Sequence, residues 1–267
     1  MDSLSIAPPD AATELRALRR RIIEISAASG EGHIPSAFSI LDILWVLYDG
    51  ILRIDPREPQ NEDRDRFILS KGHGCLGLYA ILASKGFFPF AALADFAKFN
   101  SPFGGHPDST KLPGVEASTG SLGHGFPMAV GSALGMRIRE LRRRVFCLIG
   151  DGEANEGSIW EAALLAAHHR LANLVCIVDY NHSTDRALAL GDIGSKFAAF
   201  GWVVCDVDGH DHAALRRGLA LGGADAPLCL VAHTVKGFGC PPMENQPAWH
   251  HRSPTQAEMY ELVRSLA

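Results

Sequence analysis

The chain has 267 residues, of which 47% are hydrophobic and 21% charged. This is enough for one large domain with a substantial core. A net charge of −5 and a pI near 6.2 argue against nucleic acid or an anionic membrane surface as the main partner. The six cysteines show no C-x-x-C spacing, and several lie in apolar runs, so they indicate buried free thiols rather than a zinc site or a disulfide framework.

No targeting or membrane segment is expected. Residues 1–21 lack a basic stretch followed by an apolar one, and no run reaches the roughly 18 apolar residues of a membrane span. We therefore expect a cytoplasmic protein without membrane contact.

The first half of the chain predicts helices separated by polar loops. The first helix begins at Asp10, a good N-cap after two prolines, and extends to about residue 30. A polar connection at 53–66 leads into the apolar run FIL before Ser70, and a Gly-, Pro- and His-rich stretch occupies 100–126. Further helices are predicted at 39–48, 74–85 and 126–141.

The second half alternates between apolar runs and helical segments. This is the pattern of parallel strands joined by crossover helices, and it predicts an α/β fold with a mostly parallel sheet. Long loops at 100–126 and 238–253 are rich in Pro and His, and such loops are more often functional than neutral. The predicted strands are 145–149, 174–178, 202–207 and 228–232, with helices near 156–169 and 211–221 and a closing helix.

The turn Gly150-Asp151-Gly152 follows the first of these strands and opens a helix. Free N–H groups and the helix dipole attract phosphate there, but the carboxylate of Asp151 would repel it. A hard cation such as Mg²⁺ between carboxylate and diphosphate removes the conflict. The glycines allow the backbone to approach the ligand. Asn155 at the third glycine position makes a dinucleotide fingerprint a poorer fit.

Asn181 can supply a second ligand for the same cation. It follows the strand at 174–178, with 28 residues between it and the Gly-Asp-Gly turn. Because ligands of open α/β sheets lie beyond the carboxyl ends of the strands, Asp151 and Asn181 are expected to converge on one ion.

These motifs resemble the thiamine diphosphate fingerprint and the amino-terminal part of transketolases. The resemblance covers nearly the whole chain, through segments 29–44, 64–74, 103–125, 145–181 and 234–251. It implies a three-layer thiamine-diphosphate-binding fold in which residues 1–267 form a single diphosphate-binding domain. It also implies thiamine diphosphate with Mg²⁺, or Ca²⁺ or Mn²⁺ in its place.

The resemblance assigns roles to four histidines in Gly- or Pro-containing loops. His73 should contact the cofactor near its diphosphate, while His33, His106 and His250 should line the substrate channel and move protons to and from substrate oxygens. His250 should also approach the diphosphate. Four other histidines have no motif around them and are not expected to act directly: His168, His169, His210 and His212.

Further site residues follow from the same resemblance. Gly120 and Leu122 match the segment that contacts the pyrimidine ring, and Lys236 matches a lysine near the diphosphate. Glu156 matches the glutamate of an acidic cluster between cofactor sites. Ser183 completes the metal set with Asp151 and Asn181.

Two positions depart from the family pattern. His124 stands where many members have Gln, close to the expected cofactor pocket, and could tune substrate preference. His182 follows Asn181 and is a second variable position.

The family's full-length members use a glutamate on a pyrimidine-binding domain that follows the diphosphate-binding domain. The chain ends before such a domain, so we expect a split transketolase with the pyrimidine-binding and C-terminal domains on a partner chain. The family's symmetry suggests an α₂β₂ heterotetramer. The resemblance thus implies transfer of a two-carbon ketol unit from a ketose to an aldose, only with that partner. Either sugar can be a phosphate, and a pentose phosphate, a modified sugar and a sulfonated sugar all remain open as substrates.

Two other functions stay open. One is a subunit of another thiamine enzyme, similar to deoxyxylulose-phosphate synthase or to a 2-oxo acid dehydrogenase alpha chain. The other is a non-catalytic homologue that keeps the fold and binds the cofactor.

Overall fold

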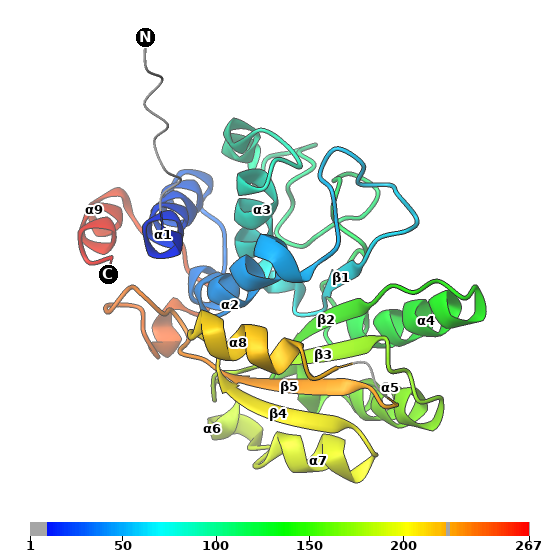
Figure 1. Ribbon diagram of the computed structural model, residues 1–267. Coiled ribbons are helices and arrows are strands. Elements are labelled where there is room, and N and C mark those ends of the chain that lie inside the picture. Colours follow the sequence, from blue (N-terminus) through cyan, green and yellow to red (C-terminus); the bar gives the residue numbers. More distant parts are fainter. Residues whose placement is uncertain (1–9, 223–224, 267) are drawn as a thin grey trace.

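The computed structural model describes residues 10–222 and 225–266. Residues 1–9, part of the segment in which no targeting sequence was expected, lie outside the described residues. A five-stranded sheet lies between two layers of helices (Figure 1). Every strand pairing is parallel, in the order β1-β2-β3-β5-β4. This confirms the predicted three-layer α/β fold. The strands are β1 Arg66–Leu69, β2 Val145–Gly150, β3 Leu174–Tyr180, β4 Val203–Asp208 and β5 Leu228–His233.

One face of the sheet is covered by α1, α2, α3 and α8 (Figure 1). Alternate strand residues such as Phe146 and Ile177 point into this layer because side chains alternate across a strand. The short helix α9 packs on the outside of α1. The bounds are α1 Ala11–Ser29, α2 Ile34–Val46, continued by the π-helical turn η1 Leu47–Ile51, α3 Cys75–Ser84, α8 His212–Leu219 and α9 Gln256–Arg264.

The opposite face is covered by α4, α5 and α7, which pack on the other set of strand side chains, among them Cys147 and Val178. The remaining short elements lie in loops. The bounds are α4 Gly125–Ile138, α5 Gly157–His168, α6 Asp185–Leu188, α7 Ile193–Ala199, and the 3₁₀ turns η2 Gly72–Gly74, η3 Phe90–Asp95, η4 Glu153–Asn155 and η5 Pro247–Trp249.

Every predicted helix and strand has a counterpart in the structure, but β1, α6 and α7 were not predicted, and one helix begins earlier than predicted. The helix predicted at 39–48 begins earlier, at Ile34, because Pro35 fits the first turn of a helix, where its missing N–H is not needed. No helix was predicted between the strands at 174–178 and 202–207, yet α7 makes that crossover. The Asp10 cap is confirmed, since its carboxylate accepts from the Thr13 N–H at 2.8 Å. All six cysteines are free, and five are buried.

Helix α2 runs through the middle of the first layer. All thirteen of its residues are buried, so it is surrounded by protein on every side rather than on one face. The stretch Ile34–Ile51 is long and apolar enough to cross a membrane, which contradicts the expectation that no segment would be. It is 83% buried inside the protein, as expected of a core helix.

Candidate functional site

The Gly150-Asp151-Gly152 turn lies at the carboxyl end of β2, and Asp151 is only 2% exposed. The Asp151 carboxylate accepts hydrogen bonds from the Gly152 N–H at 2.7 Å and from the Ser183 N–H at 2.9 Å. The Ser183 hydroxyl lies 3.3 Å from the same carboxylate. Burial, followed by the charge of Asp179, raises the pKa of Asp151, so this carboxylate favours a nearby positive charge.

Asn181 joins this group from the end of β3. Its side-chain N–H₂ donates to Asp179 at 2.9 Å, which turns its amide oxygen towards the Ser183 N–H at 3.1 Å. The structure thus brings Asp151, Asn181 and Ser183 together, as the sequence predicted. Asp151 is the single carboxylate of this predicted set. Among residues 10–222 and 225–266, no group of three or more His, Cys, Asp or Glu is arranged to hold a metal.

Asp179, the last but one residue of β3, connects four segments around the site. It is fully buried and accepts from the Lys71 ammonium at 2.5 Å and from the Ser39 hydroxyl at 2.9 Å, besides Asn181 and the Thr234 hydroxyl. Burial alone would raise the pKa of Asp179, but the charge of Lys71 lowers it. The carboxylate therefore stays ionised and holds the Lys71 side chain at the floor of the site.

Glu153, two residues after Asp151, has a similar connecting role. It is 2% exposed and accepts from the Ser70 hydroxyl at 2.5 Å, the Gly123 N–H at 2.9 Å and the Gly150 N–H at 3.3 Å. It therefore ties the end of β1 and the loop before α4 to the turn after β2.

These side chains surround one cavity of about 270 Å³ at the carboxyl edge of the sheet. Lys236 and His250 form one side, with the Lys236 Nζ 2.8 Å from the His250 Nδ1. Burial, and then repulsion by Lys71, lowers the pKa of Lys236 to about 8. The residues that line the cavity are His33, Lys71, His73, Gly120, Leu122, Gly150, Asp151, Gly152, Glu153, Asn181, Ser183, Lys236 and His250.

Histidines gather at the mouth of the cavity. The ring centroid of His33 lies 5.3 Å from that of His73 and 5.5 Å from that of His250, and His251 stacks on His33 at 4.3 Å. Burial and the neighbouring cationic groups lower the pKa of His33 to about 4 and that of His73 to about 2. Both rings are therefore neutral near pH 7 and can accept as well as donate hydrogen bonds.

Residues 10–266 match the family model described as "Transketolase, thiamine diphosphate binding domain". The chain belongs to this family. It is 36% identical to a subunit of the apulose-4-phosphate transketolase of Phocaeicola vulgatus, over 93% of this chain and 91% of that one. It is also 36% identical to 6-deoxy-6-sulfo-D-fructose transketolase subunit SqwG of a Clostridium species, over 92% of both chains.

Among solved structures, the transketolase from Leishmania mexicana superposes with a TM-score of 0.86 at 28% identity. The match covers 95% of this chain but only 41% of that transketolase. The chain thus spans the thiamine-diphosphate-binding part of a longer transketolase, whereas it matches the apulose-4-phosphate and sulfofructose transketolase subunits over nearly their full length.

The other residues assigned from the family resemblance lie at varying distances from the cavity. The ring of His106 is exposed and lies within 3.2 Å of where a Cβ on Gly120 would be, so it packs directly over a cavity residue. Glu156 is exposed at the start of α5, and Glu153 rather than Glu156 lines the cavity. His124 is exposed at the start of α4, with its Nδ1 3.1 Å from the Leu122 carbonyl.

His182 faces an adjoining cavity of about 660 Å³. The two cavities have Asn181, Ser183, Lys236 and His250 in common, so they adjoin along these residues. It offers room for a substrate beside the groups that would hold a cofactor.

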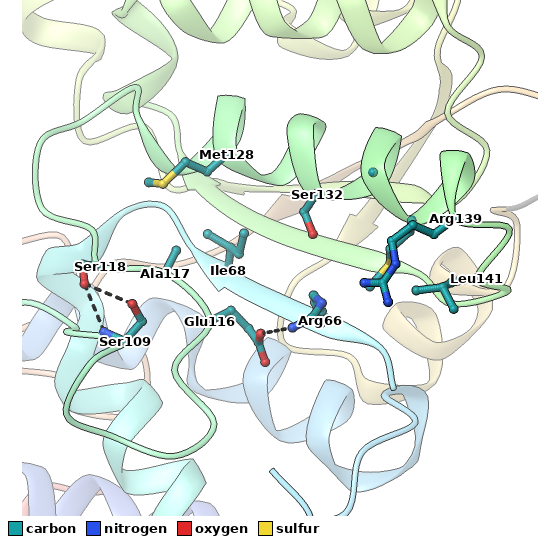
Figure 2. Close-up of a pocket in the computed structure, with 12 residues that line it drawn as sticks. Arg66, Ile68, Ser109, Glu116, Ala117, Ser118, Met128, Ser132, Arg139 and Leu141 are labelled. Carbon is teal, nitrogen blue, oxygen red and sulfur yellow. Dashed lines mark hydrogen bonds and ion pairs between the residues drawn. The ribbon is translucent and has the colours of Figure 1, made fainter. Parts of the chain in front are cut away.

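A further cavity, of about 580 Å³, lies between α4 and the loop at 109–118 (Figure 2). Four of its polar residues are already engaged in pairs: Arg66 pairs with Glu116 at 2.9 Å, and the hydroxyls of Ser109 and Ser118 lie 3.2 Å apart. The predicted site residues all lie outside its lining. We therefore assign the function to the cavity at the carboxyl edge of the sheet.

Four residues around the cavity were not predicted from the sequence: Lys71, Asp179, Glu153 and Ser70. A signal was available for Asp179, because an acidic residue inside the apolar run LVCIVDY must have a partner once the strand is buried. Its partner Lys71 is 108 positions away, and only the fold brings the two together.

Proposed function

We propose that this chain is the N-terminal subunit of a transketolase that acts with a companion protein. The reaction is the transfer of a two-carbon ketol unit from a ketose to an aldose, with thiamine diphosphate and Mg²⁺ as cofactors. One observation carries the proposal: Asp151, Asn181 and Ser183 converge with Lys71, Lys236 and the histidine cluster on a single cavity.

The donor set fits a metal-bound diphosphate. Asp151 and Asn181 offer a carboxylate and an amide oxygen, which are hard ligands that Mg²⁺ accepts, and Mg²⁺ commonly completes its coordination with phosphate oxygens and water. A single protein carboxylate is therefore sufficient. Lys236 and His250 supply hydrogen-bond donors and positive charge for the diphosphate on the other side of the cavity.

Thiamine diphosphate, when bound, supplies the carbon nucleophile for the reaction. The chain's own residues bind and orient. Gly120 and Leu122 line the same cavity as Asp151, and neutral His33 and His73 can hydrogen-bond substrate hydroxyls and move protons between them. The adjoining cavity beside His250 gives the substrate a way in.

The relatives named as transketolase subunits, rather than as whole transketolases, support a companion chain that contributes the pyrimidine-binding and C-terminal domains. We propose an α₂β₂ assembly of this kind, in which residues 1–267 form one diphosphate-binding domain. We also propose that it works in the cytoplasm, which cell fractionation would test. The names of the relatives include apulose 4-phosphate and sulfofructose, so phosphorylated and sulfonated sugars are the substrate classes to test first.

The test uses this chain purified alone, and together with the product of a neighbouring gene that encodes the missing domains. Thiamine diphosphate, Mg²⁺, a ketose phosphate donor and an aldose acceptor should give two-carbon transfer only with both proteins. An Asp151→Ala variant in the same mixture serves as the control for the metal site. Transfer by this chain alone would refute the need for a companion, and CO₂ release from pyruvate would instead indicate another thiamine enzyme.

A further inference from the structure

His210 lies outside the cavity but touches the segment that carries Lys236. It follows β4 in a turn where the Gly209 N–H donates to the His233 carbonyl at 2.8 Å. A Cβ on Gly209 would lie 2.4 Å from the Thr234 side chain, so only glycine permits this close approach. The turn therefore sets the His210 ring directly against the chain after β5.

The hydrogen bonds of His210 define its tautomer. The Val235 N–H donates to the His210 Nε2 at 2.9 Å, so Nε2 carries no proton. The proton is then on Nδ1, which donates to the Asp42 carboxylate at 3.1 Å. The ring also stacks on Phe238, with a centroid distance of 3.5 Å and an interplanar angle of 15°.

Asp42 is a fixed anchor for this arrangement. It is 4% exposed, on the buried helix α2, and it also accepts from Arg19 at 2.8 Å and contacts the His212 Nε2 at 2.9 Å. Burial opposes its charge, but the hydrogen bonds of His210 and His212 together with the charge of Arg19 outweigh burial and lower the pKa of Asp42 to about 2. The carboxylate is therefore ionised at every ordinary pH and keeps the Nδ1 proton of His210 in place.

The Val235 amide is the link between this cluster and the site. Its neighbours are held elsewhere: the Thr234 N–H donates to the Tyr180 carbonyl at 3.2 Å, and the Gly237 N–H donates to the Pro35 carbonyl at 3.0 Å. His210 supplies the contact to Val235, immediately before Lys236. We propose that His210 is a positioning residue, which orients the Lys236 side chain towards His250 and the diphosphate subsite.

His212 provides a matched control. Both histidines contact the Asp42 carboxylate, but only His210 is bonded to Val235. If the Asp42 cluster were merely structural, both His210→Ala and His212→Ala would lower stability. The two variants would then have the same effect on the NMR resonances of Lys236. If His210 positions Lys236, only His210→Ala should alter the NMR resonances of the Lys236 side chain and remove the hydrogen-exchange protection of the Val235 amide, by about tenfold or more.

A second measurement uses inorganic pyrophosphate with Mg²⁺ as the probe, binding to the full chain in calorimetry. This arm rests on the proposed function. We expect His210→Ala to weaken binding about five- to tenfold, as for loss of one oriented hydrogen-bonding group. His210→Gln should restore most of it, because the glutamine oxygen can accept from the Val235 N–H. In a Lys236→Met background the His210→Ala change should add little, since the two act through one contact.

The outcomes separate the two proposals. If the wild-type chain does not bind pyrophosphate, the cofactor assignment fails, while the Lys236 resonances and Val235 exchange still decide the role of His210. If His210→Ala leaves both unchanged, or if His212→Ala changes them equally, His210 is not a positioning residue. Should His210→Ala fail to fold, His210→Phe and His210→Gln make the same comparison, because only glutamine retains an acceptor.

Discussion

The buried pair Lys71–Asp179 leads to a quantitative prediction about stability. The Lys71 side chain is 2% exposed, and Asp179 is fully buried. Asp179→Asn keeps the shape of the side chain, and its amide oxygen can still accept from Lys71 and Ser39. The Thr234 hydroxyl can rotate to accept from the new N–H₂ group. The substitution therefore removes mainly the negative charge and leaves the Lys71 ammonium buried without its counter-charge.

Removing one partner of a buried ion pair costs about 3–5 kcal/mol. For comparison, two unit charges about 4 Å apart interact by about 4 kcal/mol at an effective dielectric constant of 20. Unfolding entropy of about 2.1 cal/mol/K per residue, applied to 267 residues, converts this loss into a fall in Tm of about 5–9 °C. The double variant Asp179→Asn/Lys71→Met should lose less than the sum of the two single variants, because it leaves no uncompensated charge.

Urea unfolding and calorimetry of the wild type, both single variants and the double variant would measure the loss of stability, the fall in Tm and the coupling between the two residues. The folded-state pKa of Asp179 is lowered, so its contribution is present above the unfolded value of about 3.9 and is lost as the pH falls through the folded pKa. Asp179→Asn should therefore flatten the stability profile in acid. A loss below about 1 kcal/mol, or strict additivity in the double variant, would show that the pair is not coupled as described.

Three further predictions concern the site and the backbone around it. Asp151→Ala should weaken Mg²⁺-dependent pyrophosphate binding by more than about 100-fold in calorimetry. Even the loss of groups that only orient metal ligands lowers metal affinity by about 10–100-fold. Unchanged binding would place the metal elsewhere. Gly123→Ala should destabilise the chain by at least about 1–2 kcal/mol, because Gly123 has a φ of +80° and an added Cβ would lie 2.6 Å from the Glu156 Cβ. Gly131→Ala, a helical glycine with open space around it, should be neutral or stabilising in the same unfolding assay. The folded-state pKa of Lys236 is lowered to about 8 from 10.5, so stability of the free chain should rise between these pH values, and Lys236→Met should abolish that rise.

The parts of the fold that follow from local patterns were predictable. The four apolar runs of the second half became parallel strands β2 to β5, and Asp10 caps α1 as its position after two prolines indicated. The start of α2 and the crossover helix α7 were less visible. Every residue of α2 is buried, which leaves no amphipathic period to mark its first turn. Helix α7 has only seven residues, too few for a clear periodic signal.

The residues of the candidate site also fall into two groups, those that could be predicted from the sequence and those that could not. The sequence could predict Asp151, Asn181 and the loop histidines because they lie in turns or loops. Polar residues next to glycines in such segments indicate a side chain that can reach a ligand rather than one in the core. Lys71, Glu153 and His210 could not be assigned, since each acts through a partner that is distant in sequence or through a backbone N–H. His210 shows this most clearly: its sequence context is an ordinary turn, and its contacts with Asp42 and Val235 join positions 168 and 25 residues away.

The charges of the cavity lead to a final prediction about the order of ligand binding. Mg²⁺ alone would bring positive charge close to Lys71 and Lys236, and burial together with repulsion by Lys71 already lowers the pKa of Lys236. Pyrophosphate alone would bring negative charge close to Asp151, whose pKa is already raised by burial and by Asp179. Together the two ligands satisfy both sides, because the metal lies between the carboxylate and the phosphate. Calorimetric titrations should therefore show that saturating Mg²⁺ tightens pyrophosphate binding by at least about tenfold, with the same factor in the reverse order, as thermodynamic linkage requires. Independent binding of the two ligands would contradict a shared metal–diphosphate site.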